Sequence, residues 1–272
     1  MKLNNLQEGA QRLLTETCQI LNDEKINYII VGGWSPFLLN GNPINHPGTK
    51  DVDVLFEDGY KRENLKGIIL KFLDKGYLLS AKHDFQLFKE IEVENKKFIY
   101  NIDLLHPSET KTPDEIYIDH IDLGIPSDKY KSSTFKMKSI ALPSSQILFS
   151  HDLKTILSID GVKINLMNEI GTLITKSESI KIPKRYRDSL DVYFAITQNK
   201  DYPDLIKNLR NLKEKDPDGF NSLYGIREFY ESNEIKMYNN IKRFIGNYKL
   251  AEFKESMNSF ISDIGLDKEA AH

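Results

Sequence analysis

The apolar residues of this chain change their spacing near residue 168, and this change limits the folds open to it. Before it, stretches with helical spacing at 5–24 and 62–75 alternate with short β-branched runs, a pattern typical of an α/β arrangement. We interpret as strands residues 27–33, 51–58, 84–93, 96–105, 134–142 and 153–166, the last with a hairpin turn at Asp160-Gly161. After Asn168 only helical spacing remains, over 168–178, 184–198, 202–214, 218–231, 234–246 and 249–263. We therefore predict an α/β domain over residues 1–166 and a helical domain over 167–272.

Composition excludes several classes of protein. The chain has 272 residues, 40% of them hydrophobic and 28% charged, which is ordinary for a globular protein. The net charge of −3 gives no global reason to expect nucleic-acid binding. Cys18 is the single cysteine, so no internal disulfide can form, and we expect a reducing, cytoplasmic location. No apolar run approaches the ~18 residues of a membrane helix, so we expect no membrane partner.

Three aspartates are candidates for a metal site. Asp51 and Asp53 alternate with valines, and this period of two places both carboxylates on one side of a strand. Asp103 lies near the end of a later predicted strand. If the strands are neighbours, the three charges would repel one another, and Mg²⁺ would relieve the repulsion. Two such ions about 4 Å apart can clamp the attacking and leaving oxygens of a nucleotidyl transfer. The alternative is a surface strand with an unrelated acid at Asp103.

A glycine pair precedes these acids. The predicted strand at 27–33 ends in Gly32-Gly33, and a short helix follows at 34–41. Glycine lets backbone N–H groups approach phosphate oxygens closely, and Ser35 could add a hydroxyl contact. The alternatives are a plain tight turn for the glycines and a helix cap for Ser35. The order of the motifs carries more weight than any one of them: strand, glycine turn, helix, loop, acid-x-acid strand, later acid strand.

In this order, residues 31–35 (VGGWS), 49–56 (TKDVDVLF) and 101–105 (NIDLL) resemble the DNA polymerase β-like nucleotidyltransferase superfamily. The resemblance implies an α/β (α+β) nucleotidyltransferase core with a mixed sheet, followed by a C-terminal all-helical region. It implies that Asp51 and Asp53 bind two Mg²⁺ ions and that Asp103 completes the site or helps to deprotonate the acceptor. It also implies that Gly32, Gly33 and Ser35 hold the phosphates of a nucleoside triphosphate (NTP). Two departures are an insertion at 42–48 and a glycine at position 33, where many members have serine.

The second half is similar to the abortive-infection toxin-like (AbiEii-like) branch of that superfamily. That branch has a lysine on the first helix after the sheet and then a basic-Asp-x-x-Asp stretch, which here are Lys176 and RYRDSLDVYF at 185–194. The resemblance implies that Lys176 reaches the triphosphate, with a supporting role for Thr49, Lys50, Arg187, Asp188 and Asp191. The alternatives are a solvated helix end for Lys176, and pairing of the two aspartates with Lys184, Arg185 or Arg187. The resemblance covers about residues 25–195.

The resemblance implies a Mg²⁺-dependent enzyme that moves a nucleoside monophosphate from an NTP to an acceptor hydroxyl. The expected acceptor is an RNA such as tRNA, or a protein, in a toxin-like role that a partner antitoxin could restrain. One alternative is an antibiotic-modifying enzyme with a small-molecule acceptor. Another is a non-catalytic binding module that keeps the nucleotidyltransferase fold.

Three further features bear on the site. Trp34 could stack on a base, although core packing is the commoner fate of a tryptophan. The basic residues between 176 and 187 would suit a nucleic-acid acceptor, or would form a solvated face. The histidines show no metal-ligand spacing, so we expect them at the surface or in loops.

Overall fold

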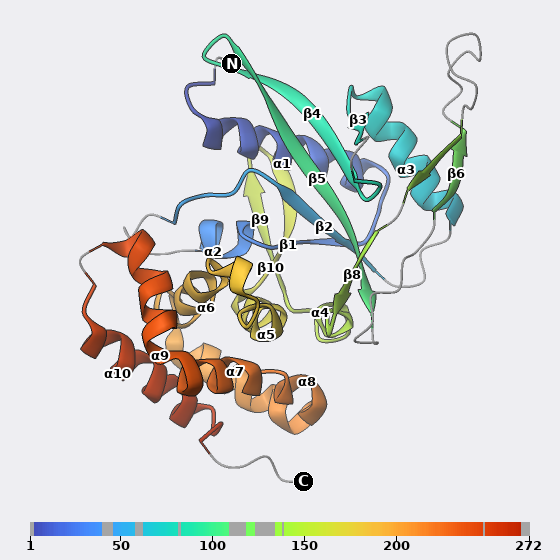
Figure 1. Ribbon diagram of the computed structural model, residues 1–272. Coiled ribbons are helices and arrows are strands. Elements are labelled where there is room, and N and C mark those ends of the chain that lie inside the picture. The colour runs from blue at the N-terminus through green and yellow to red at the C-terminus, as the bar shows by residue number, and fades with distance from the viewer. Residues whose placement is uncertain are drawn as a thin grey trace. The chain divides into compact units, whose positions relative to one another are not determined.

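The computed structural model describes residues 3–39, 46–57, 62–80, 83–108, 118–122, 134–137, 139–246 and 248–267 (Figure 1). Its contacts divide the chain into two compact units. The first unit contains Met1–Gly32, Thr49–Phe149 and Lys154–Leu166. The second unit contains Gly33–Gly48, Ser150–Leu153 and Met167–His272. The second unit therefore includes two segments that precede its helical C-terminal part in the sequence.

A mixed sheet forms the centre of the first unit. Its order is β3-β4-β5-β2-β1-β10-β9, and β8 also pairs with β5. The strands are β1 (Tyr28–Val31), β2 (Val52–Phe56), β3 (Leu78–Leu79), β4 (Gln86–Val93), β5 (Lys96–Ser108), β8 (Ile140–Pro143), β9 (Lys154–Ile159) and β10 (Val162–Met167). Strand β2 is antiparallel to β1 but parallel to β5, which makes the sheet mixed. The expected α/β core with a mixed sheet is thus confirmed.

One predicted strand is wrong. The run 134–142 forms two strands, β7 (Thr134–Met137) and β8, which belong to different sheets. Strand β7 pairs with β6 (Ile118–Asp122) in a two-stranded ribbon, whereas β8 pairs with β5 in the main sheet. The apolar pattern runs through both strands, so it did not reveal that their partners differ.

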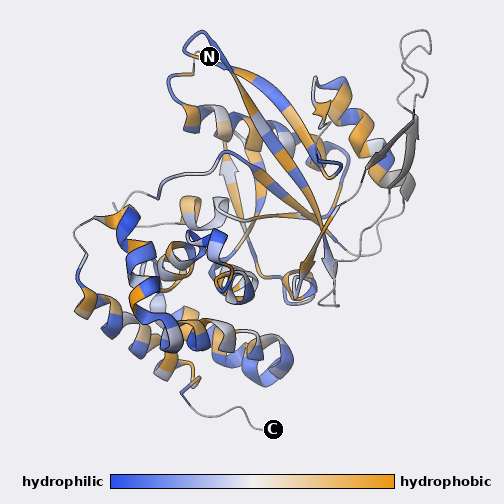
Figure 2. Cartoon of the chain, in the orientation of Figure 1, coloured by the Kyte–Doolittle hydropathy of each residue, from blue (hydrophilic) through white to orange (hydrophobic). Residues whose placement is uncertain are grey.

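Helix α1 (Leu6–Asp23) covers one face of the sheet. Asn5 caps the helix, since its side chain accepts a hydrogen bond from the Glu8 backbone N–H. Its apolar stripe is buried, and the Tyr100 hydroxyl of β5 donates to the Leu6 carbonyl. Figure 2 shows how apolar and polar residues alternate along β4 and β5. This alternation turns one face of these strands toward the core and leaves the other face more exposed.

The remaining helices of the first unit are α3 (Arg62–Asp74) and α4 (Gln146–Ser150). Those of the second unit are α2 (Trp34–Leu39), α5 (Glu169–Ser179), α6 (Asp188–Thr197), α7 (Tyr202–Lys215), α8 (Pro217–Asn221), α9 (Tyr224–Ile245) and α10 (Leu250–Asp263). A single 3₁₀ turn at Pro183–Arg185 precedes α6. The C-terminal region is helical, as expected, and Trp34 is fully buried in the core. Of the helices that the structure describes, none is long and apolar enough to cross a membrane.

Candidate functional site

Asp53 and Asp103 lie side by side in the sheet. Strand β2 pairs with β5 in parallel, and the register places Asp53 directly opposite Asp103. Paired residues on neighbouring strands point to the same face, so both carboxylates project from one side. The valines that flank Asp53 are buried on the opposite side. The alternation of acids and apolar residues in the sequence therefore produces this arrangement.

Asp51 lies next to this pair, at the exposed start of β2. The Asn101 side chain donates a hydrogen bond to Asp51 Oδ1 at 3.4 Å. Asn101 is two residues before Asp103, so it lies on the same face of β5. The three aspartates that the sequence singled out therefore share one face of the first unit. We call them the carboxylate cluster.

Asp103 is partly buried in the sheet. Burial raises the pKa of its carboxyl group above the usual value, and the negative charge of Asp51 raises it further. The hydrogen bond that Gln86 Nε2 donates at 2.7 Å and the nearby His83 act in the opposite direction. The net effect is a raised pKa, which makes the ionised Asp103 a stronger base than an ordinary aspartate.

Gly32 closes the cluster from the end of β1. Its φ is +74°, a left-handed conformation that favours glycine. A Cβ atom at this position would lie only 2.1 Å from Asp53 Oδ2. The turn after β1 therefore brings backbone against the Asp53 carboxylate, and it can do so because position 32 has no side chain.

The donors of the cluster suit a hard cation, since they are all carboxylate oxygens on one face. Among the residues that the structure describes, however, no three His, Cys, Asp or Glu side chains are gathered closely enough to hold a metal ion. Asp51, Asp53 and Asp103 thus fit Mg²⁺ in chemistry and in their placement on the sheet, although they do not surround one point. Metal binding remains a prediction for these residues.

Lys176 is buried in the second unit. Its Nζ lies 2.7 Å from Asp188 Oδ1 and 3.1 Å from Asp191 Oδ2, and only 6% of the residue is exposed. The Ser179 hydroxyl also donates to Asp188, at 2.5 Å. The alternative of a solvated helix end at Lys176 is therefore wrong. Of the alternative partners Lys184, Arg185 and Arg187, only Arg187 acts on Asp191, through its charge, and the ion pairs of the two aspartates with a lysine are those with Lys176 among the described residues. The role of Lys176 in binding a triphosphate stays a prediction.

His46 joins this ion-paired group, and of the two expected places, the surface or a loop, it occupies a loop. It is buried there, and its Nε2 is 3.0 Å from Asp191 Oδ1. The backbone N–H of Gly48 donates to Nδ1, so the ring carries its proton on Nε2 and donates it to Asp191. Arg187 donates to the Gly48 carbonyl at 3.2 Å. Sequence reasoning missed His46 because it lies 145 residues from its partner.

Charges around Asp191 outweigh its burial. Desolvation alone would raise the pKa of this carboxyl group. Lys176, the hydrogen bond from His46 and the charge of Arg187 more than offset it, so the pKa is lowered. The same pairing raises the pKa of Lys176 despite its burial. The group is therefore a charged, internally neutralised cluster that ties the 46–48 segment to α5 and α6.

The other predicted site residues are placed as follows. The Ser35 hydroxyl is buried, donates to the Met167 carbonyl at 2.6 Å and lies 2.9 Å from the Thr172 hydroxyl. Gly33 accepts the first backbone hydrogen bond of α2, from Phe37. Thr49 is buried and donates to the Asp51 carbonyl at 3.4 Å, whereas Lys50 is exposed. Their roles in nucleotide binding stay predictions.

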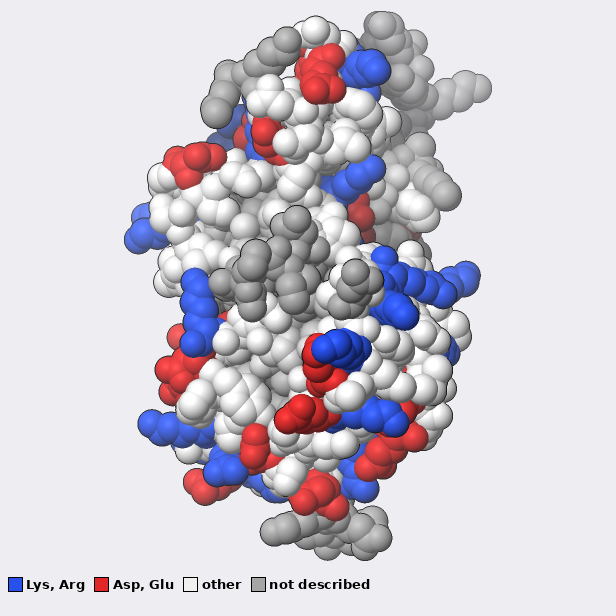
Figure 3. Space-filling view, turned by 90° about the vertical axis from the view of Figure 1, so that its left-hand side faces the viewer, with Lys and Arg blue, Asp and Glu red and all other residues white. Residues whose placement is uncertain are grey.

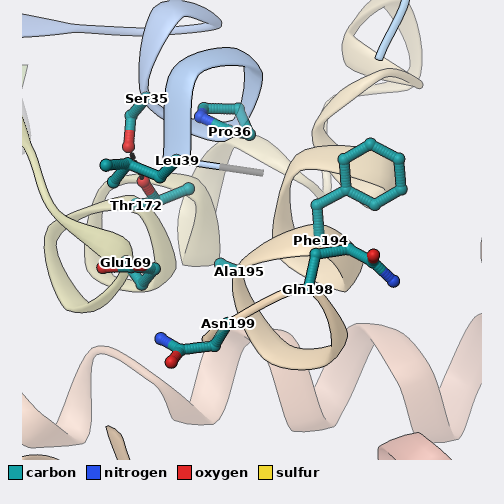
Figure 4. Close-up of a pocket in the computed structure, with 9 residues that line it drawn as sticks. All are labelled: Ser35, Pro36, Leu39, Glu169, Thr172, Phe194, Ala195, Gln198 and Asn199. Atoms are coloured by element: carbon teal, nitrogen blue, oxygen red, sulfur yellow. Dashed lines mark hydrogen bonds between the residues drawn. The ribbon is translucent and has the colours of Figure 1, made fainter. Parts of the chain in front are cut away.

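A pocket in the second unit lies beside Ser35 (Figure 4). Residues from α2, α5, α6 and the following turn line it, including Leu39, Glu169 and Gln198. Its free volume is about 10 Å³, which has room for roughly one water molecule. This pocket is therefore too small to be a nucleotide site.

No family model and no curated protein sequence matches the chain. Among solved structures, it is similar to an antigenic nucleotidyltransferase-like protein from Paracoccidioides brasiliensis. The two are 16% identical, the match covers 83% of this chain and 95% of the other, and the TM-score is 0.37. A TM-score this low does not establish a family for the chain.

Proposed function

We propose that the chain is a Mg²⁺-dependent nucleotidyltransferase whose reaction takes place at the carboxylate cluster. The observation that carries the proposal is the pairing of Asp53 with Asp103 on neighbouring parallel strands, with Asp51 beside them on the same face. The close approach of Gly32 to Asp53 supports it. The order of motifs in the sequence points to the same reaction.

In the proposed reaction, the acceptor hydroxyl attacks the α-phosphorus of the NTP in line, and pyrophosphate leaves. Asp103, which lies directly opposite Asp53 on the neighbouring strand, accepts the proton of the attacking hydroxyl. Asp51 and Asp53 hold Mg²⁺, which when bound neutralises the charge of the phosphates. The protein then contributes mainly by holding the reactants in position.

The finer form of the proposal is a toxin-like enzyme that modifies an RNA or a protein and is restrained by a partner. Its support is the resemblance of Lys176 and the Asp188/Asp191 stretch to the abortive-infection branch. A small-molecule acceptor such as an antibiotic remains the alternative. Expression in bacteria separates the two, since the toxin-like enzyme slows growth and the antibiotic-modifying enzyme changes drug susceptibility.

The test is transfer of label from each of the four NTPs, labelled at the α-phosphate, to pooled RNA, a protein extract or an antibiotic panel. We expect Asp51→Asn and Asp53→Asn each to lower the rate on the order of 10³-fold, because each removes one charge that holds the metal. Asp160→Asn is the matched control, since Asp160 is an exposed turn residue far along the sheet from the cluster. Full activity in both cluster variants would show that the site lies elsewhere.

A non-catalytic binding module is the second candidate. The observation that favours it is that, in the part of the chain that the structure describes, the three carboxylates are not gathered around a single position. Calorimetry decides between the two candidates. If the chain is the proposed enzyme, it binds the NTP only when Mg²⁺ is present. If it is a binding module without catalytic activity, Mg²⁺ does not change its binding of the NTP.

A further inference from the structure

The face that carries the carboxylate cluster continues along β4 and β5 to β3. The strand registers align the side chains of this face in rows: Gln86 opposite Asp103, Phe88 opposite Asn101, Glu90 opposite Ile99, and Leu78 opposite Phe88. Residues two apart on a strand share a face, so Asn101 and Ile99 follow Asp103 on the same side. The continuous surface from Asp103 to Leu78 lies within the first unit.

Apolar side chains on this surface are exposed to solvent. Ile99 is 65% exposed and Leu78 is 52% exposed, and Phe88 between them is partly exposed. On the opposite face of the same strands, Leu87 and Ile102 are buried. We call Leu78, Phe88 and Ile99 the apolar strip. Exposed apolar residues that lie together in this way mark a binding surface more often than scattered ones do.

The charges beside the strip are mainly acidic. Glu90 and Glu92 are exposed on the same face of β4, and Lys97, opposite Glu92, pairs with Glu90 at 2.6 Å. A partner on this surface would therefore carry apolar and basic groups.

These features disfavour two classes of acceptor. RNA binds through basic grooves that neutralise its phosphates, with aromatic stacking in addition, and acidic residues border this strip. A small molecule binds in a concave pocket that encloses most of it. Ile99 and Leu78 expose half or more of their surface to solvent, so they do not form the walls of a pocket.

We propose that the acceptor is a polypeptide that docks an apolar and basic segment on the apolar strip and presents a side-chain hydroxyl to the carboxylate cluster; this rests on the proposed nucleotidyl transfer. The hydroxyl oxygen forms a bond to the α-phosphorus while the bond to the bridging oxygen of pyrophosphate breaks. The proton of the hydroxyl passes to Asp103 and then to solvent. The product is a phosphodiester between the nucleotide and the protein side chain.

The test compares Ile99→Glu with Ile156→Glu. Both isoleucines are exposed on strands of the first unit, at 65% and 61%, but Ile156 lies on β9 at the other end of the sheet. Each variant is incubated with Mg²⁺, α-labelled NTP and a bacterial protein extract treated with ribonuclease. We expect protease-sensitive label with the natural chain and with Ile156→Glu, and about tenfold less with Ile99→Glu. Calorimetry should give the same affinity for Mg²⁺ and NTP in all three.

Three results would each overturn the proposal. They are label that protease does not remove, label that forms only without ribonuclease, and equal labelling by Ile99→Glu and the natural chain. The absence of protein label despite Mg²⁺-dependent NTP binding would also overturn it and leave nucleotidyl transfer standing. If the natural chain binds no NTP, both proposals fail. Label on a protein counts as support only together with its loss in Ile99→Glu.

Discussion

Gly32 joins backbone geometry to the chemistry of the carboxylate cluster. Two separate features make glycine necessary there, the left-handed φ of +74° and the 2.1 Å approach of an added Cβ to Asp53. The first feature affects only the stability of the turn. The second would also displace a carboxylate that we propose as a metal ligand.

Gly76 allows the two effects to be separated. Its φ is +81°, but an added Cβ there meets no atom within 4 Å. We expect Gly32→Ala and Gly76→Ala each to lose about 1–2 kcal/mol of unfolding free energy from backbone strain. Only Gly32→Ala should also weaken Mg²⁺-dependent NTP binding, which calorimetry measures. Equal binding by the two variants would contradict the placement of Asp53 in the site.

At the scale of elements, the buried charges of the second unit hold two helices and a loop together. Lys176 at the end of α5 pairs with Asp188 and Asp191 at the start of α6, and His46 extends the group to the 46–48 segment. Replacing Lys176 by a neutral side chain would leave two buried carboxylates without its positive charge. This lowers the unfolding free energy much more than the loss of an exposed ion pair does.

We therefore expect Lys176→Met to lower the unfolding free energy by about 3–5 kcal/mol near neutral pH. Lys181→Met is the control, since the pairs of Lys181 with Glu178 and Glu228 are more exposed and should be worth less than about 1 kcal/mol. Denaturant unfolding measures both values. Similar losses in the two variants would show that the buried group does not stabilise the fold.

The same variant should change how stability depends on pH. In the natural chain the pKa of Asp191 is lowered below its ordinary value of 3.8. The contribution of the ionised Asp191 to the unfolding free energy is therefore present above pH 3.8 and is lost as the pH falls through the lower pKa of the folded state. Without Lys176, burial instead favours the protonated carboxyl group. The loss of unfolding free energy caused by Lys176→Met should therefore become smaller as the pH falls from neutral toward the ordinary pKa of Asp191.

Local patterns predicted the elements, and distant contacts explain what was missed. The β4–β5 hairpin was predictable because its alternation and its Glu94-Asn95 turn lie in one short stretch, and both turn residues have positive φ. The alignment of Asp53 with Asp103 required only that β2 and β5 be neighbours. By contrast, the split of 134–142 depends on two different partner strands, and the burial of His46 depends on Asp191 far along the chain.

At the scale of the whole molecule, charge offers no general affinity for nucleic acid. The net charge is −3, and on the face that Figure 3 shows, basic and acidic residues are interspersed. The proposed binding of an anionic NTP would therefore have to come from a specific site with its metal. A ligand that binds the folded state at such a site stabilises the whole unit that contains it.

This gives a test of the site that needs no acceptor. With Mg²⁺ and an NTP analogue whose α–β bridge cannot be cleaved, both at 100 times the dissociation constant, we expect about 2.7 kcal/mol of stabilisation. For a protein of this size that raises the melting temperature by roughly 5–10 °C. Chelation of Mg²⁺ should abolish the shift, as should Asp51→Asn combined with Asp53→Asn, whereas Asp160→Asn should keep it. A shift that survives in the double variant would mean that the nucleotide binds away from the carboxylate cluster.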